Sequence, residues 1–119
     1  MKFENSDDFP FYKKKLSNPF LEKCNLLNLP AVDGVTVNEV STRPERIASL
    51  KQYGAVESME GAPLHYVCLQ NDIPFIQIRA ISNYVGERDK SKWQIKKALD
   101  NLNSTVIRYL EELTARQLL

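Results

Sequence analysis

The sequence predicts an α/β fold in which a layered sheet, mixed or mostly parallel, is flanked by helices. Two observations indicate this class. From residue 33 onward, short β-branched stretches alternate with segments whose apolar residues recur at helical spacing. In addition, residues 73–82 are apolar on both faces, as interior strands of parallel sheets are. A length of 119 residues suits one domain of this kind.

The first 32 residues are predicted to form an irregular arm, ahead of a partial α/β domain at residues 33–119. In the arm, Pro10, Pro19 and Pro30 interrupt a mixture of aromatic and polar residues that has no clean period. One short helix is expected near residues 20–27, and the arm offers no evident strand.

The first strand–helix unit follows the arm. Alternating β-branched residues predict a strand at residues 34–41. A helix is expected next, because Thr42 and Glu45 have the spacing of a capping box. Residues 55–58 then predict a short strand and residues 60–71 a second helix.

The last unit is the predicted strand at residues 73–82, followed by a loop and a long helix. Ser91 and Gln94 form a second capping-box pattern, and apolar residues recur at helical spacing from Ile95 to Leu113. Because three strands make a narrow sheet, we expect the chain to be incomplete by itself.

Composition excludes several classes of protein. The net charge of +1 gives no sign of a nucleic-acid or anionic-membrane partner. No apolar stretch is long enough to cross a bilayer, and acids stand where a signal peptide needs an apolar core, so a cytoplasmic location is expected. Cys24, Cys68 and the single histidine, His65, form no metal-binding pattern. We therefore expect no metal and no cofactor.

Polar residues gather where the predicted strands end. They lie in residues 38–42, 57–61 and 79–83. Ligands of α/β proteins usually bind beyond the carboxyl ends of the strands, and those ends meet at one rim if the strands are parallel. A carboxylate at this rim can accept hydrogen bonds from the hydroxyl groups of a ligand.

Each candidate residue also has a purely structural explanation. Glu60 can favour the dipole of the helix that it begins, and Met59 can fill a core. Arg79 can form an ion pair, Asn83 can close a turn, and His65 can be a core or surface histidine with satisfied hydrogen bonds. Taken singly, none of these residues decides the function.

Their combination resembles a known family. "ESMEGAPLHYVC" at residues 57–68, followed by "IPFIQIRAISNYVGERDKSKW" at residues 73–93, is similar to the carboxyl-terminal half of the purine nucleoside phosphorylase and nucleosidase superfamily. Within that superfamily the sequence looks most like the futalosine hydrolases, which are nucleosidases of an alternative menaquinone pathway. The Met-Glu-Gly element and the "RAISN" stretch carry the resemblance.

The resemblance implies roles for four residues. Glu60 would accept hydrogen bonds from the ribose 2′- and 3′-hydroxyls, and Met59 would pack on the sugar. Asn83 would address the purine base, at a position where adenine-specific nucleosidases have an aspartate that acts as general acid. Arg79 would support Asn83 in this catalytic task.

The sequence also departs from the family. Pro63 stands where the family commonly has a small residue, and no counterpart is found for the amino-terminal half, which carries the acid that positions water. We therefore expect the carboxyl-terminal portion of a nucleosidase for a hypoxanthine nucleoside, inactive alone, and acting as a homo-oligomer or with a complementary amino-terminal half. The alternatives are a truncated, non-catalytic nucleoside-binding or oligomerisation module, and an unrelated α/β interaction module.

Overall fold

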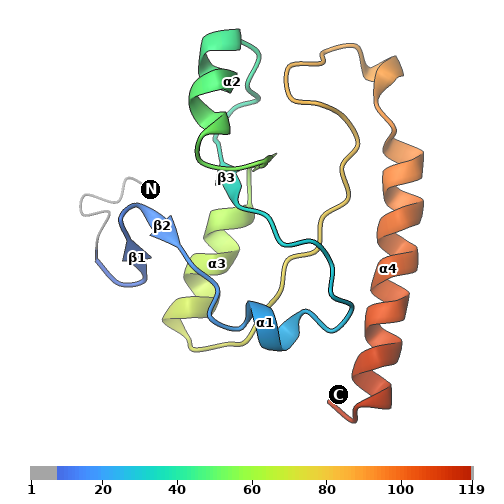
Figure 1. Cartoon of the computed structure of the whole chain (residues 1–119). Coiled ribbons are helices and arrows are strands. Elements are labelled where there is room, and N and C mark those ends of the chain that lie inside the picture. Colours follow the sequence, from blue (N-terminus) through green and yellow to red (C-terminus); the bar gives the residue numbers. More distant parts are fainter. Residues whose placement is uncertain (1–7, 119) are drawn as a thin grey trace.

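The structure, a computed structural model, describes residues 8–118. It confirms a mixed α/β fold, in which small parallel and antiparallel sheets are flanked by helices (Figure 1). The elements in chain order are β1 (Phe11–Tyr12), β2 (Lys15–Leu16), α1 (Leu21–Cys24), β3 (Gly34–Thr36), α2 (Pro44–Lys51), β4 (Val56–Ser58), α3 (Gly61–Gln70), the 3₁₀ turn η1 (Lys90–Lys92) and α4 (Ile95–Ala115).

Strands β3 and β4 are parallel and form the sheet that carries the candidate site. Thr36 pairs with Ser58 at its carboxyl end, and the N–H of Val37 extends the pairing by donating to the Ser58 carbonyl at 2.9 Å. Parallel strands need a crossover connection, and α2 supplies it. Gly54 makes the return possible, because a Cβ there would lie 2.8 Å from the Asp33 carbonyl oxygen. The strand–helix–strand–helix order predicted for this region is confirmed.

Strands β1 and β2 form an antiparallel hairpin within the segment that was expected to be an irregular arm. The turn residues Lys13 and Lys14 have φ values of 48° and 63°. Two positive φ values suit a tight hairpin turn. Asparagine and glycine are the residues that usually indicate such a turn, so two lysines do not predict it. The hairpin lies against α3, where the Phe11 and Tyr66 rings are 6.0 Å apart.

The prediction of a strand at residues 73–82 is wrong. This segment is irregular, and in Figure 1 it belongs to the long yellow-to-orange connection that runs between α3 and α4. An interior strand requires backbone partners, and no strand among residues 8–118 pairs with this segment. A side chain anchors it instead, since the Asn18 amide donates to the Phe75 carbonyl at 2.8 Å.

Both predicted capping boxes are wrong in their details. Helix α2 begins at Pro44, so the N-cap position falls on Arg43, whose extended backbone (ψ 129°) is the conformation that residues before proline prefer. Ser91 lies in η1, where its backbone N–H is accepted by the Asp89 carboxylate at 3.0 Å. Helix α4 then begins at Ile95 without a side-chain cap.

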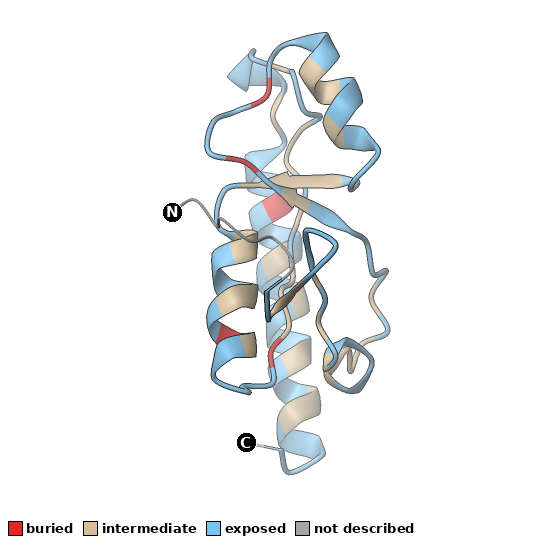
Figure 2. Ribbon diagram, turned by 90° about the vertical axis from the view of Figure 1, so that its left-hand side faces the viewer, coloured by how far each residue is buried: buried red, intermediate tan, exposed pale blue. Residues whose placement is uncertain are grey.

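The hydrophobic core is small (Figure 2). The buried apolar residues of the described chain are Val37, Cys68, Phe75 and Ala98. The accessible surface is 9489 Å², whereas a folded monomer of this mass is expected to expose about 6,600 Å². The radius of gyration is 16.0 Å, against about 13.5 Å expected for this length. The excess surface includes large apolar side chains, among them Leu99 and Ile107 on α4.

Candidate functional site

The carboxyl ends of β3 and β4 determine where α3 begins. The Thr36 hydroxyl accepts the N–H of Ala62 at 2.8 Å, and the Ser58 hydroxyl accepts the N–H of Gly61 at 3.3 Å. Two N–H groups that a helix cannot satisfy internally are thus bound by the sheet. Gly61 leaves no room for a side chain, because a Cβ there would lie 2.7 Å from the Ser58 oxygen. The junction between β4 and α3 is fixed from the sheet side.

Met59 and Glu60 lie on this junction and are both exposed. Glu60 occupies the N-cap position of α3, but its side chain makes no capping hydrogen bond. Within residues 8–118, no hydrogen bond or ion pair of its carboxylate is found. The carboxylate is therefore free to accept hydrogen bonds from a ligand, while the positive end of the helix dipole favours its charge.

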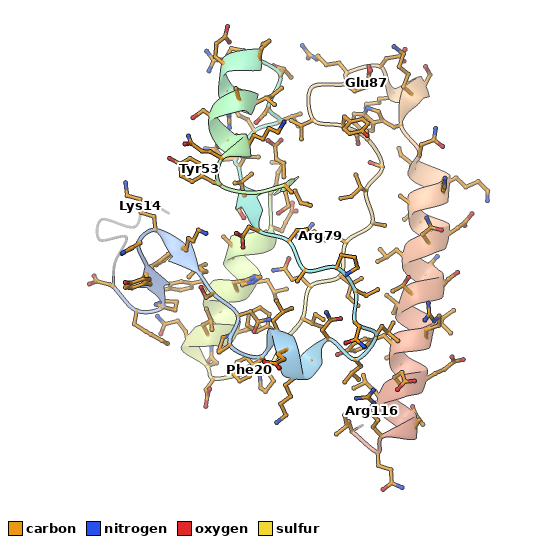
Figure 3. All side chains as sticks on the ribbon, viewed as in Figure 1. Lys14, Phe20, Tyr53, Arg79, Glu87 and Arg116 are labelled. Carbon is orange, nitrogen blue, oxygen red and sulfur yellow. The ribbon has the colours of Figure 1, made fainter. Side chains whose placement is uncertain are left out.

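Gln77, which was not among the predicted site residues, connects Arg79 to the same junction. The Arg79 guanidinium donates to Gln77 Oε1 at 3.0 and 3.3 Å. Gln77 Nε2 in turn lies 2.8 Å from the Gly61 carbonyl oxygen and 2.6 Å from His65 Nδ1. Arg79 thus contacts a neutral amide rather than an acid. Figure 3 shows Arg79 in the middle of the molecule. The signal for Gln77 was its polarity inside an otherwise apolar stretch.

His65 is held between this amide and an aromatic ring. Its imidazole meets the Phe75 ring edge-on, with centroids 4.7 Å apart. Burial lowers the pKa of His65 below its ordinary value, and the positive charge of Arg79 lowers it further, while the Gly61 carbonyl acts in the opposite direction. The imidazole is therefore neutral at neutral pH.

Asn83 lies elsewhere. Its side-chain oxygen accepts the Ser82 hydroxyl at 2.6 Å, and its amide donates to the Tyr84 carbonyl at 3.0 Å. These bonds are those of a turn residue. They also place Asn83 in a depression of about 420 Å³, which is lined by Ile81, Ser82, Asn83, Tyr84, Glu87, Lys92 and Gln94. Neither Glu60 nor Arg79 lines it, and Asn83 and Arg79 make no hydrogen bond to each other in the described chain.

Several contacts of Glu87 fix the loop beyond Asn83. The indole N–H of Trp93 donates to the Glu87 carbonyl at 2.9 Å, and the Lys92 ammonium lies 3.8 Å from the Glu87 carboxylate. In Figure 3, Glu87 lies near the start of α4, well away from Arg79. The sequence-predicted residues therefore form two groups, one at the start of α3 and one at this loop.

Glu57 joins two of the three segments expected at the rim. Its carboxylate accepts the backbone N–H of Ser41 at 3.2 Å, which ties residues 37–41 to β4. Ser41 is fully buried, and its hydroxyl has no hydrogen-bond partner in the described chain. The first two predicted rim segments meet in this way.

Among residues 8–118, no group of three or more histidine, cysteine, aspartate or glutamate side chains is placed to hold a metal ion. Over the same range, no helix combines the length and apolar character needed to cross a membrane.

Comparison with known proteins gives the family. The sequence profile of the phosphorylase superfamily matches residues 4–115. The futalosine hydrolase of Thermus thermophilus is 40% identical over 88 residues, covering 72% of this chain and 39% of that protein. The futalosine hydrolase of Streptomyces coelicolor is 32% identical over 73 residues, covering 61% of this chain and 31% of that protein. The chain thus spans well under half the length of these relatives. No solved structure matches. The chain belongs to the phosphorylase superfamily.

Proposed function

We propose that the chain is the nucleoside-binding part of a futalosine hydrolase-like nucleosidase, which cleaves the N-glycosidic bond of a hypoxanthine nucleoside in menaquinone biosynthesis. The observation that carries the proposal is the Glu60 carboxylate, exposed beside Met59 at the start of α3 and free of intramolecular hydrogen bonds in the described chain. The similarity to two futalosine hydrolases supports the reaction class.

The chemistry assigns different tasks to the two groups of residues. In hydrolysis, water adds to the anomeric carbon, the bond to the base nitrogen breaks, and the base leaves with a proton. The sugar becomes positively charged in the transition state, so an anchoring carboxylate on its hydroxyls both orients the ring and favours that charge. We assign this anchoring to Glu60. The Asn83 amide carries two N–H donors: one is bound by the Tyr84 carbonyl, and the other can serve the acceptor edge of hypoxanthine formed by N7 and O6.

No described acid is assigned to water. Glu57 is engaged by the Ser41 N–H, and Glu60 is assigned to the sugar. We therefore propose that this chain by itself binds the nucleoside without turning it over at an ordinary enzymatic rate, and that catalysis requires a second copy or a complementary chain.

Calorimetric titration of the chain with inosine and with free hypoxanthine tests the proposal. Tighter binding of inosine than of hypoxanthine is expected, because the sugar adds the Glu60 contacts. Absence of inosine binding at millimolar concentration would contradict it. Parallel assays of hypoxanthine release test the second part: a rate on the order of 1 per second or more would show that the chain is a complete catalyst.

The second candidate function is a non-catalytic oligomerisation module. The large accessible surface of 9489 Å² favours it, since this surface is open to a partner. The same titration separates the two candidates, because an oligomerisation module has no reason to discriminate inosine from hypoxanthine.

A further inference from the structure

The side chain of Gln77 connects the candidate sugar site to the segment that carries Arg79. All four of its hydrogen-bonding positions are used: the oxygen accepts twice from Arg79, and the amide nitrogen faces both the Gly61 carbonyl and His65 Nδ1. Gln77 is half-buried, and Gly61 directly follows Glu60 in the chain.

The amide can adopt only one orientation here. If its oxygen and nitrogen were exchanged, the oxygen would face the Gly61 carbonyl at 2.8 Å and the nitrogen would face the Arg79 donors. Both contacts would be repulsive. Gln77 therefore presents its N–H groups to Gly61 and His65.

This orientation in turn selects a state of His65. At 2.6 Å, Nδ1 must accept the N–H of Gln77, so the imidazole is neutral and carries its proton on Nε2. The Gly61 carbonyl oxygen also lies 3.2 Å from Nδ1. It could accept a proton from that atom only if Gln77 gave up its own bond there.

Gly61 itself is closely packed. A Cβ on Gly61 would lie 2.7 Å from the Ser58 hydroxyl and 3.6 Å from Gln77 Oε1. The first turn of α3 is thus enclosed by the sheet on one side and by Gln77 on the other.

We propose that Gln77 is a positioning residue for the sugar site: by tying Gly61 and the neutral His65 to the segment of Arg79, it fixes the first turn of α3 and hence the Glu60 carboxylate. This inference rests on the proposed function, in which Glu60 holds the ribose. Gln77 does not itself touch the nucleoside.

The test uses the full chain with Gln77→Leu, which removes the amide, and Gln77→Glu, which replaces its donor by a carboxylate oxygen. Gln52→Leu is the matched control, since Gln52 is exposed and bonds only within its own helical turn. Circular dichroism first confirms that each variant folds. Because the chain has one histidine, nitrogen NMR reads the protonation of His65 without ambiguity.

The wild-type chain and Gln52→Leu are expected to show a neutral His65 protonated on Nε2 at pH near 7.5. Gln77→Glu is expected to place a proton on His65 Nδ1, because the new carboxylate oxygen needs a hydrogen-bond donor opposite it. The positive charge of Arg79 acts against this protonation, because it lowers the pKa of His65. Gln77→Leu is expected to weaken inosine binding about tenfold and to leave hypoxanthine binding unchanged.

Each failure has a distinct meaning. An unchanged His65 state in Gln77→Glu, or wild-type inosine affinity in Gln77→Leu, overturns this inference and leaves the proposed function standing. Equal losses for inosine and hypoxanthine show a general structural role and also overturn it. A wild-type chain that binds no inosine overturns the proposed function and this inference together.

Discussion

The Tyr109 hydroxyl donates a hydrogen bond to the Cys24 carbonyl oxygen at 2.6 Å and so joins α4 to the end of α1 across 85 residues. Burial raises the pKa of the Tyr109 hydroxyl above its ordinary value, with a further rise from Cys24, so the group remains a donor at neutral pH. Since few buried residues hold α4, this bond is one of its main attachments to the rest of the molecule.

Tyr109→Phe is expected to lower the free energy of unfolding by about 0.5–1.5 kcal/mol, the usual net value of such a bond. Denaturant unfolding measures the change. Tyr53→Phe is the matched control, because that ring is 57% exposed. Equal effects of the two substitutions would show that the bond to Cys24 adds nothing.

Glu60→Gln is expected to weaken inosine binding at least about tenfold, since a hydrogen bond to a charged group contributes roughly 1.5–3 kcal/mol. Hypoxanthine binding should change little, because the base does not reach the carboxylate. Calorimetry of both ligands makes the comparison, and Glu111→Gln on the exposed face of α4 is the control. A similar loss for inosine and hypoxanthine would assign Glu60 a structural role.

Asn83→Asp is expected to shift base preference from hypoxanthine toward adenine nucleosides. A carboxylate opposite O6 places an acceptor against an acceptor, which costs about 1–3 kcal/mol when it is buried. The ratio of inosine to adenosine affinity is the quantity to measure, with Asn101→Asp on α4 as the control. If the ratio stays at its wild-type value, Asn83 only closes its turn.

The stability of the chain is expected to fall as the pH drops below about 6.5, the ordinary pKa of histidine. The pKa of His65 is lowered in the folded chain, mainly by burial. In that pH range the unfolded chain therefore binds more protons than the folded one, and acidification favours unfolding. Urea unfolding at about pH 7.5 and about pH 5.5 measures the difference, above the range where most carboxylates titrate. His65→Asn should remove most of it, and a variant that keeps the full pH dependence would place its origin elsewhere.

The chain is expected to self-associate through the apolar side chains on α4. Ile95, Leu99, Ile107 and Leu110 are between 47% and 57% exposed. Sedimentation across a range of concentrations should show species larger than 13.7 kDa. Ile107→Glu should reduce the association, and Asn101→Glu on the opposite face of α4 should not. A monomer at every concentration would exclude this role for α4.

The sequence pattern predicts those elements whose residues contact near neighbours in the chain. The β3–α2–β4–α3 unit could be predicted because β-branched alternation and helical spacing are properties of short windows. The N-cap of α2 lies one residue later than predicted, because Pro44 is tolerated only in the first turn of a helix and here occupies its first position. The β1–β2 hairpin was not predicted because its turn places Lys13 and Lys14 at positive φ, a conformation that lysine rarely adopts.

The remaining errors concern partners distant in sequence. Residues 73–82 have the composition of an interior strand, but a strand exists only where another backbone pairs with it. Likewise, the local pattern predicts Glu60 at its helix start, whereas the link from Arg79 through Gln77 to His65 depends on how the segment after α3 folds back. Gln77 and His65 are 12 residues apart, and neither helical spacing nor strand alternation relates them.

The bond between the Trp93 indole and the Glu87 carbonyl has an optical consequence. Trp93 is the single tryptophan of the chain, so its fluorescence comes from one place. That place adjoins the depression lined by Asn83, Tyr84 and Glu87. A purine that settles there and moves this loop will change the polarity around the indole. The emission spectrum of the unlabelled protein can therefore report arrival at the Asn83 depression separately from events at Glu60.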